Sequence, residues 1–117
     1  MHELSICQAL VGQLKALARE RRASRICLVR LGIGPLSGVE PQLLEQAWPV
    51  ASAGTVAEGA GLVLERLPLR VHCPSCGRDS DASTNRLSCR HCGDWRTRLV
   101  SGDELLLDSV ELIREAV

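Results

Sequence analysis

The N-terminal part of the chain distributes apolar and polar side chains with the period of a helix. From Glu3 to about Arg22, apolar residues recur every three or four positions, as in an amphipathic helix with one buried face. That face includes Cys7, Leu10, Leu14 and Leu17. Basic residues gather in the last turns and Glu3 lies in the first, which is the order of charge that stabilises a helix dipole. We therefore expect a helix that begins almost at residue 1.

Four shorter patterns predict the remaining elements. Arg25–Leu31 is rich in branched apolar residues and ends at a glycine-rich stretch, which predicts a strand followed by a loop. Val39–Trp48 has the pattern of a second helix, which we expect Pro49 to kink or end. Leu62–Val71 alternates as a second strand does, and Asp103–Leu112, with apolar side chains on both faces, has the pattern of a third.

Two cysteine pairs carry the strongest chemical signal in the chain. Cys73 and Cys76 form one C-x2-C pair, and Cys89 and Cys92 form another. Two such pairs on facing turns supply four thiolates at tetrahedral positions, the closed shell that structural zinc prefers. The stretch between the pairs is polar and cannot build a core of its own, so metal ligation must supply its folding free energy.

Other uses of the cysteine segment have weaker support. A redox-active dithiol needs a single C-x2-C beside a helix N-terminus rather than two facing pairs. His72 and His91 flank the thiolates, where they can donate hydrogen bonds to sulfur, replace a protonated thiolate in acid, or simply be solvated. Cys7 and Cys27 fall in apolar patterns, so we expect small buried side chains rather than reactive thiols.

The order of the predicted elements gives an α+β fold. We expect a small three-stranded mixed sheet covered by two helices, with an inserted four-cysteine zinc-ribbon-like module. Residues 1–70 and 101–117 are expected to form one discontinuous α/β domain, and residues 71–100 a zinc-binding domain. Trp48 is expected in the core, and Trp95, just past the last cysteine, is expected to shield the zinc module.

Composition narrows the class of protein. The chain has 14 basic and 14 acidic residues, two Trp and no Phe or Tyr, so it lacks the basic face and the stacking platforms of a nucleic-acid binder. No apolar run approaches the ~20 residues of a membrane span, and the N-terminal sequence does not have the pattern of a signal peptide. Phosphate-loop, nucleophile-elbow, zinc-protease and dinucleotide motifs are absent from the sequence. We expect a cytoplasmic protein that is not an enzyme and has neither nucleic-acid nor membrane partners.

The first three residues, Met1-His2-Glu3, form a second candidate metal site. The amine of Met1, the backbone amide of His2 and the His2 imidazole can close fused five- and six-membered chelate rings, with the amide or carboxylate of Glu3 available for a further position. Planar, nitrogen-rich sets of this kind favour Ni(II) and Cu(II) over Zn(II). A histidine at position 2 also arises by chance, so this pattern alone is weak evidence.

Together these motifs resemble one family. The start Met-His-Glu-Leu-Ser, the Gly-Val-Glu-Pro sequence before the second helix, the paired cysteines and the Gly-Asp-Glu-Leu sequence before the last strand are similar to the HypA/HybF nickel metallochaperones of NiFe-hydrogenase maturation. The resemblance covers essentially the whole chain. It implies that His2 is the principal nickel ligand, completed by Glu3 and neighbouring backbone nitrogens including the Met1 amine, and that Cys73, Cys76, Cys89 and Cys92 hold a structural zinc.

The resemblance also implies a cargo and partners. Nickel would be the cargo, delivered to the hydrogenase large-subunit precursor with a HypB-type GTPase as donor or assembly partner, and a homodimer is possible. Two rival interpretations remain at this point: a zinc-ribbon adaptor for nucleic acid or protein, and a zinc store. The neutral charge balance and the scarcity of aromatic residues disfavour a nucleic-acid adaptor, and a zinc store does not explain the start of the chain.

Overall fold

The computed structural model describes residues 2–114 of the chain. In chain order its elements are α1 (His2–Glu20), β1 (Ala23–Ile33), α2 (Pro41–Ser52), β2 (Gly61–Arg66), β3 (Arg70–His72), β4 (Asp79–Asp81), β5 (Arg98–Ser101) and β6 (Leu105–Arg114). The chain divides into two compact units. The first contains the described residues up to Leu31, Val39–Leu64 and the described residues from Leu107 onward; the second contains Gly32–Gly38 and Glu65–Leu106.

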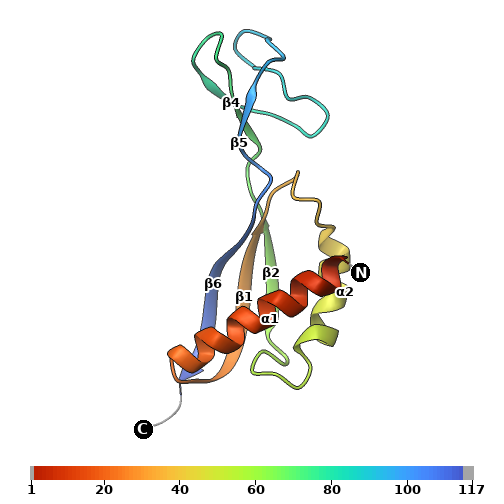
Figure 1. The fold of residues 1–117 in the computed structure, drawn as a ribbon, viewed down its shortest axis with the longest axis vertical. Helices are drawn as coiled ribbons and strands as arrows, with labels where there is room; N and C mark the ends of the chain where they lie inside the picture. The colour runs from red at the N-terminus through yellow and green to blue at the C-terminus, as the bar shows by residue number, and fades with distance from the viewer. Residues whose placement is uncertain (1, 115–117) are drawn as a thin grey trace. The chain divides into compact units, whose positions relative to one another are not determined.

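The sheet of the first unit has the strand order β2-β1-β6. The N–H of Ile26, near the start of β1, donates to the carbonyl of Val56, which precedes β2. The N–H of Leu67, which follows β2, donates to the carbonyl of Ile33 at the end of β1. The two strands therefore run in the same direction and are parallel. The arrows of Figure 1 show β6 running in the opposite direction to β1. The prediction of a small mixed three-stranded sheet is confirmed.

The core lies between this sheet and the helices. α1 crosses one face of the sheet and contacts α2 (Figure 1). The buried side chains include Cys7, Leu10, Leu14 and Ala18 of α1, Ile26, Val29 and Leu31 of β1, and Leu44 and Trp48 of α2. Trp48 is 4% exposed, and its indole N–H donates to the carbonyl of Ala60 at 2.9 Å, so its predicted core position is confirmed. Neither helix has the length and apolar character of a membrane span.

Pro49 was expected to kink or end the second helix, and it does not end it. α2 continues through it to Ser52. A proline inside a helix removes the hydrogen bond to the carbonyl four residues earlier, here that of Glu45. Both Glu45 and Pro49 lie on the exposed side of α2, where water can bind that carbonyl, while Trp48 and Ser52 keep the helix buried on its other side.

The predicted second strand is two strands. β2 ends at Arg66 and β3 begins at Arg70, because Pro68 between them has no N–H to donate to a sheet. β3 belongs to a second, antiparallel sheet of order β4-β3-β5, in which Val71 lies opposite Ser80 of β4 and Leu99 of β5. This sheet was not expected from the sequence: β4 lies in the polar stretch between the cysteine pairs, and β5 lies after the second pair.

Candidate metal centres

The four cysteine sulfurs of the second unit converge on one point. All lie within 4.8 Å of one another. The Sγ atoms of Cys73 and Cys92 are 3.5 Å apart, and those of Cys76 and Cys89 are 3.7 Å apart. Four sulfurs about 2.3 Å from a central zinc would be separated by about 3.8 Å at tetrahedral corners. The donor set and its spacing therefore fit a structural zinc ion.

Each cysteine pair is held by the same backbone turn. The N–H of Gly77 donates to the carbonyl of Cys73 at 2.7 Å, and the N–H of Gly93 donates to the carbonyl of Cys89 at 2.9 Å. Both glycines adopt positive φ angles, 75° and 79°, which a side chain would strain. Sequence reasoning missed these two residues. The glycine directly after each pair was the available signal.

A polar link joins the two turns independently of any metal. Ser75, inside the first cysteine pair, donates a hydrogen bond from its hydroxyl to the carboxylate of Asp94, just past the second pair. Arg96 donates to the same carboxylate from its backbone N–H at 2.9 Å and from its side chain. The side-chain hydrogen bonds from Arg96, followed by that from Ser75, hold the pKa of Asp94 well below its usual range. Nothing in the sequence pattern pairs Ser75 with Asp94.

The electrostatics of the sulfurs favour a bound cation. Hydrogen bonds with the backbone of Cys92 and of His91 lower the pKa of Cys89 to about 6; the N–H of His91 lies 3.3 Å from the Cys89 sulfur. A backbone hydrogen bond with Asp94 acts to lower the pKa of Cys92, but the neighbouring Cys73 thiol, together with burial, outweighs it and raises that pKa to about 12. Four sulfurs this close cannot all ionise without a positive charge between them.

The flanking histidines lie apart from the sulfur cluster. Nδ1 of His72 is 2.7 Å from a carboxylate oxygen of Asp79, its cross-strand partner on β4. The side chain of His91 is exposed, and its backbone rather than its imidazole contacts sulfur. Within residues 2–114, the cluster that could hold a metal consists of the four cysteines.

Trp95 does not shield the zinc module, contrary to the expectation. Its side chain is 78% exposed, and Leu87 of the same unit is also exposed. Two of the ligands, Cys73 and Cys89, are nevertheless buried. Position next to a ligand in the sequence was therefore a poor guide to the burial of Trp95.

At the other candidate site, α1 begins at His2 and Glu3. The His2 side chain is 62% exposed, and its Nδ1 lies 3.6 Å from Oε2 of Glu3, whose side chain is only 12% exposed. Met1, and with it the predicted N-terminal amine ligand, lies outside the described residues. The start of α1 therefore presents an accessible imidazole against a largely buried carboxylate.

Glu3 also caps the second helix. Its Oε2 accepts a hydrogen bond from the N–H of Glu40 at 3.2 Å, and Glu40 is the N-cap residue of α2 and has no capping side chain of its own. This hydrogen bond, followed by one from the backbone of Glu3 itself and by contributions from His2, lowers the pKa of Glu3. The carboxylate is therefore ionised and fixes the start of α1 against the start of α2. The sequence offered no signal for this contact between residues far apart in the chain.

Apolar residues surround the remaining side of Glu3. A shallow groove of about 260 Å³ beside it is lined by Leu4, Leu43, Gln46, Ala47 and Val50. None of these side chains except Gln46 offers a donor atom of a kind that binds metal. Apart from Gln46, the lining of this groove therefore supplies no further side-chain ligand for a metal at His2.

The two cysteines outside the pairs differ from each other. Cys7 is fully buried and its thiol donates to the carbonyl of Leu44 at 3.6 Å; burial, and then the charge of Glu3, raise the pKa of this thiol. The expectation of a small buried side chain is confirmed for Cys7. It is wrong for Cys27, which is exposed on β1. The apolar run of β1 hid the fact that one of its faces is only partly covered.

Comparison with known proteins places the chain in one family. A family model described as hydrogenase/urease nickel incorporation, metallochaperone, hypA, matches residues 1–112. A hydrogenase maturation factor HypA of Nitrosospira multiformis is 54% identical over 97% of this chain and 98% of its own. The corresponding factor of Aquifex aeolicus is 42% identical over 96% of this chain and 97% of its own.

Solved structures show the same fold. The solution structure of a HypA protein superposes with a TM-score of 0.75 at 25% identity, covering 98% of both chains. That of the nickel metallochaperone HypA from Helicobacter pylori gives 0.71 at 23% identity, covering 97% of this chain and 98% of its own. With its four-cysteine metal site, the chain belongs to the HypA family of metallochaperones for nickel incorporation, which are maturation factors and not enzymes.

Proposed function

We propose that the chain binds Ni(II) at Met1-His2-Glu3 and delivers it to the NiFe-hydrogenase large-subunit precursor, while Cys73, Cys76, Cys89 and Cys92 hold a structural zinc. The observation that carries the proposal is the exposed His2 imidazole against the ionised Glu3 carboxylate at the first turn of α1, in a member of a nickel-incorporation family.

The backbone at this end of α1 supports a nitrogen-rich site. The first four N–H groups of a helix have no carbonyl acceptor inside the helix. α1 begins at His2, so the backbone nitrogens of His2 and Glu3 are among these groups. They can release a proton to solvent and bind a metal without breaking a helical hydrogen bond. Together with the Met1 amine and Nδ1 of His2 they form a chelating set that suits Ni(II) better than Zn(II).

Glu3 has two roles in this proposal. Its backbone nitrogen is a candidate ligand, and its negative charge, 3.6 Å from Nδ1 of His2, attracts a cation and restricts the imidazole. Its carboxylate already accepts the N–H of Glu40. A carboxylate engaged in this way positions the site more readily than it enters the coordination shell.

The zinc centre plays a structural part. With four thiolates around it, the ion has no open position for a substrate, so it supplies folding free energy and no catalysis. The turns at Gly77 and Gly93 and the Ser75–Asp94 link hold the ligands in place. We propose that the second unit then offers a folded surface to partners in the cytoplasm. A HypB-type GTPase would be the source or assembly partner for nickel, and a second copy of the chain would form a homodimer.

Calorimetric titration of Ni(II) into the zinc-loaded protein tests the nickel site. We expect His2→Ala to weaken binding by about 100-fold or more, because it removes the imidazole and one chelate ring. One extra residue before Met1 should have a similar effect, because it displaces the amine. His91→Ala, which removes an exposed histidine of the second unit, is the matched control. Tight binding that survives both N-terminal changes would refute the site.

Delivery needs a second readout. Nickel-loaded protein mixed with a purified large-subunit precursor should lose its metal to the precursor, and the transfer should accelerate with a HypB-type GTPase present. Because the ligands must lose protons to bind, we expect nickel affinity to fall between pH 8 and pH 6. An affinity that stays constant over that range would contradict ligation by amine, amide and imidazole.

A further inference from the structure

The outer edge of β6 is free in the part of the chain that the structure describes. β6 is the end strand of the order β2-β1-β6 and is ten residues long. A typical strand has about 5–6 residues, and natural edge strands are usually short or carry proline or charged side chains, lysine above all. β6 is longer than this and contains neither proline nor lysine, and its charged residues are Asp108, Glu111 and Arg114. Its outward N–H and C=O groups form a long template for another strand.

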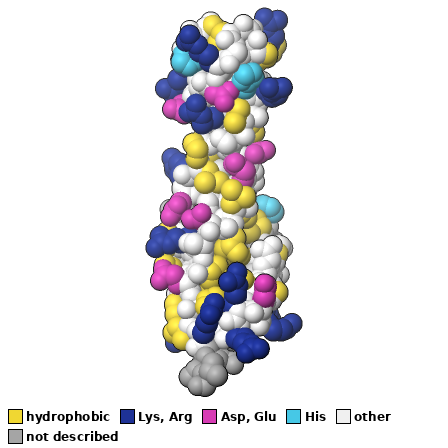
Figure 2. All heavy atoms as spheres, turned by 90° about the vertical axis from the view of Figure 1, so that its left-hand side faces the viewer, with side chains coloured by type: hydrophobic (Ala, Val, Ile, Leu, Met, Phe, Trp, Pro, Cys, Tyr) yellow, Lys and Arg dark blue, Asp and Glu magenta, His cyan; other side chains and the backbone are white. Residues whose placement is uncertain are grey.

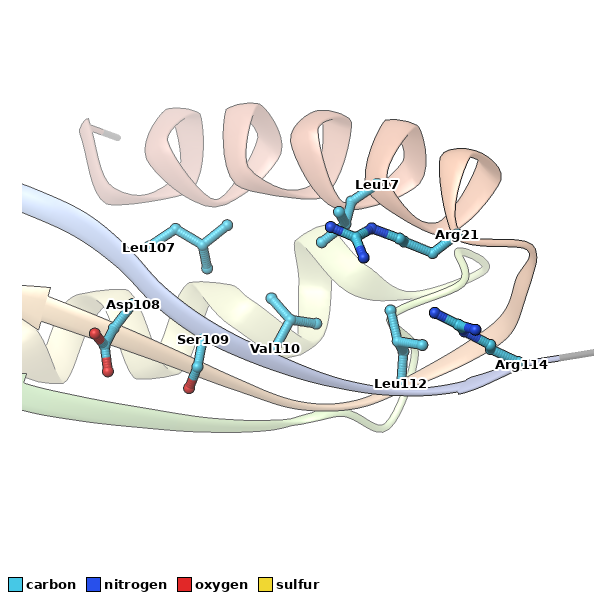
Figure 3. Close-up of a pocket in the computed structure, with 8 residues that line it drawn as sticks. All are labelled: Leu17, Arg21, Leu107, Asp108, Ser109, Val110, Leu112 and Arg114. Carbon is cyan, nitrogen blue, oxygen red and sulfur yellow. The ribbon is translucent and has the colours of Figure 1, made fainter.

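A groove lined by both apolar and polar side chains, among them Asp108 and Ser109, lies beside this edge. It has a volume of about 400 Å³ and runs between the C-terminal part of α1 and β6. Figure 3 shows the side chains of Leu107, Val110 and Leu112 on the side of β6 that faces α1, with Leu17 of α1 directed toward them. The space-filling view in Figure 2 shows hydrophobic side chains exposed along this face of the molecule.

One end of the groove is positively charged. Arg21, just after α1, and Arg114, at the end of β6, line the same end and have exposed side chains (Figure 3). Within residues 2–114 neither guanidinium has an acidic partner. Two arginines without an acidic partner among the described residues, beside the leucine and valine side chains of the groove, favour a carboxylate in that position.

We propose that β6 and this groove bind an extended segment of a partner protein. The segment adds a strand to the edge of β6, places alternate apolar side chains in the groove and sets an acidic side chain against Arg21 and Arg114. A helix could fill the groove, but it would leave the backbone groups of the β6 edge unused. An added strand fills the groove with its side chains and also pairs with the backbone groups of the β6 edge.

The charges of β6 disfavour a second copy of the chain as the occupant. If two β6 strands paired antiparallel over their full length, Asp108 of each would lie opposite Glu111 of the other. Like charges directly opposite in a sheet are destabilising. Glu111 already faces Arg30, with 4.0 Å between the charged atoms. The proposed peptide site includes no residue of the proposed nickel site, so each can be tested independently of the other.

Peptide binding tests the proposal in the zinc-loaded, full-length protein. The probe is a fluorescent peptide of alternating valine and threonine that ends in two glutamates, and the matched probe ends in two lysines. We expect the glutamate peptide to bind at least about tenfold more tightly. The double substitution Arg21→Glu and Arg114→Glu should reverse this preference, whereas Arg19→Glu, on the exposed side of α1 outside the groove, should leave it unchanged.

Two further measurements decide between occupants. Methylation of alternate backbone nitrogens of the glutamate peptide should abolish binding, because strand addition needs those N–H groups. Sedimentation of the free protein should show no dimer that depends on Arg21 and Arg114; that is, the double arginine substitution should leave the oligomeric state unchanged. Equal affinity for both peptides, no binding of either, undiminished binding of the methylated peptide, or such a dimer would each overturn the proposal.

Discussion

The two candidate metal centres use opposite designs. The cysteine centre has four side-chain ligands, all supplied within Cys73–Cys92, on two matching backbone turns. The start of α1 offers one exposed imidazole, one ionised carboxylate and backbone nitrogens without helical acceptors. A complete ligand shell suits a metal that stays, whereas a site that is short of side-chain ligands suits a metal that must be surrendered.

The same contrast extends to how each unit is stabilised. The first unit buries a core of helix and strand residues around Leu14, Ile26 and Trp48. The second buries few apolar side chains besides Leu69 and Val71, and two of its buried residues are the ligands Cys73 and Cys89. One unit therefore depends on packing and the other on metal, which the following predictions can separate.

Loss of a cysteine ligand should have the largest effect. Structural zinc contributes about 10–16 kcal/mol of apparent binding free energy in small zinc domains, so Cys73→Ala should release the metal and unfold the second unit. Amide chemical shifts of residues 65–106 should collapse while those of α1 and β1 persist. Cys27→Ala, at an exposed cysteine outside the site, is the control. Loss of both units together would show that packing and metal are not separable.

Removal of the buried tryptophan should destabilise the first unit alone. Trp48→Ala should lower the free energy of unfolding by about 3–5 kcal/mol, because it leaves a cavity and an unpaired Ala60 carbonyl. Urea denaturation followed by circular dichroism measures this change, and zinc content should stay the same. Trp95→Ala, at the exposed tryptophan, should change stability by less than about 0.5 kcal/mol. A large effect of Trp95→Ala would contradict its exposed position.

The link between the two cysteine turns should have an intermediate effect. Asp94→Ala removes the acceptor for Ser75 and Arg96, so we expect zinc affinity to fall by about 10–100-fold, as for other residues that orient metal ligands. Competition with a chromophoric chelator measures the affinity. Asp108→Ala, an exposed aspartate of the first unit, provides the comparison. Unchanged affinity would mean that the turns alone hold the ligands.

The capping role of Glu3 should give the smallest effect and a pH dependence. Its pKa is lowered in the folded state, so its contribution is fully present above the unfolded value of about 4.5 and is lost as pH falls through the folded pKa. The Glu3→Gln variant should therefore have a lower free energy of unfolding than the unsubstituted protein at pH 7, and this difference should disappear in acid. Urea titrations at pH 7 and pH 3 test this. A difference that persists unchanged at pH 3 would exclude the ionised carboxylate as the cause.

Much of this molecule could be predicted from its sequence. The helical period located α1, the C-x2-C spacing located the four ligands that converge, and the motifs identified the family. Contacts between distant residues could not be found, because no local pattern couples Glu3 to Glu40 or Ser75 to Asp94. Prolines were also hard to interpret: α2 continues past Pro49, which lies on an exposed helix side, and Pro68 divides what was predicted as one strand.

X-ray absorption at the nickel edge tests the central claim, that cargo and structural metal occupy different ligands. One equivalent of Ni(II) added to the zinc-loaded protein should show nitrogen and oxygen neighbours only, with an imidazole signature that disappears in His2→Ala, while the zinc edge of the same sample should keep its four sulfurs. Sulfur neighbours around nickel, or zinc displaced from the cysteines on nickel addition, would contradict the account.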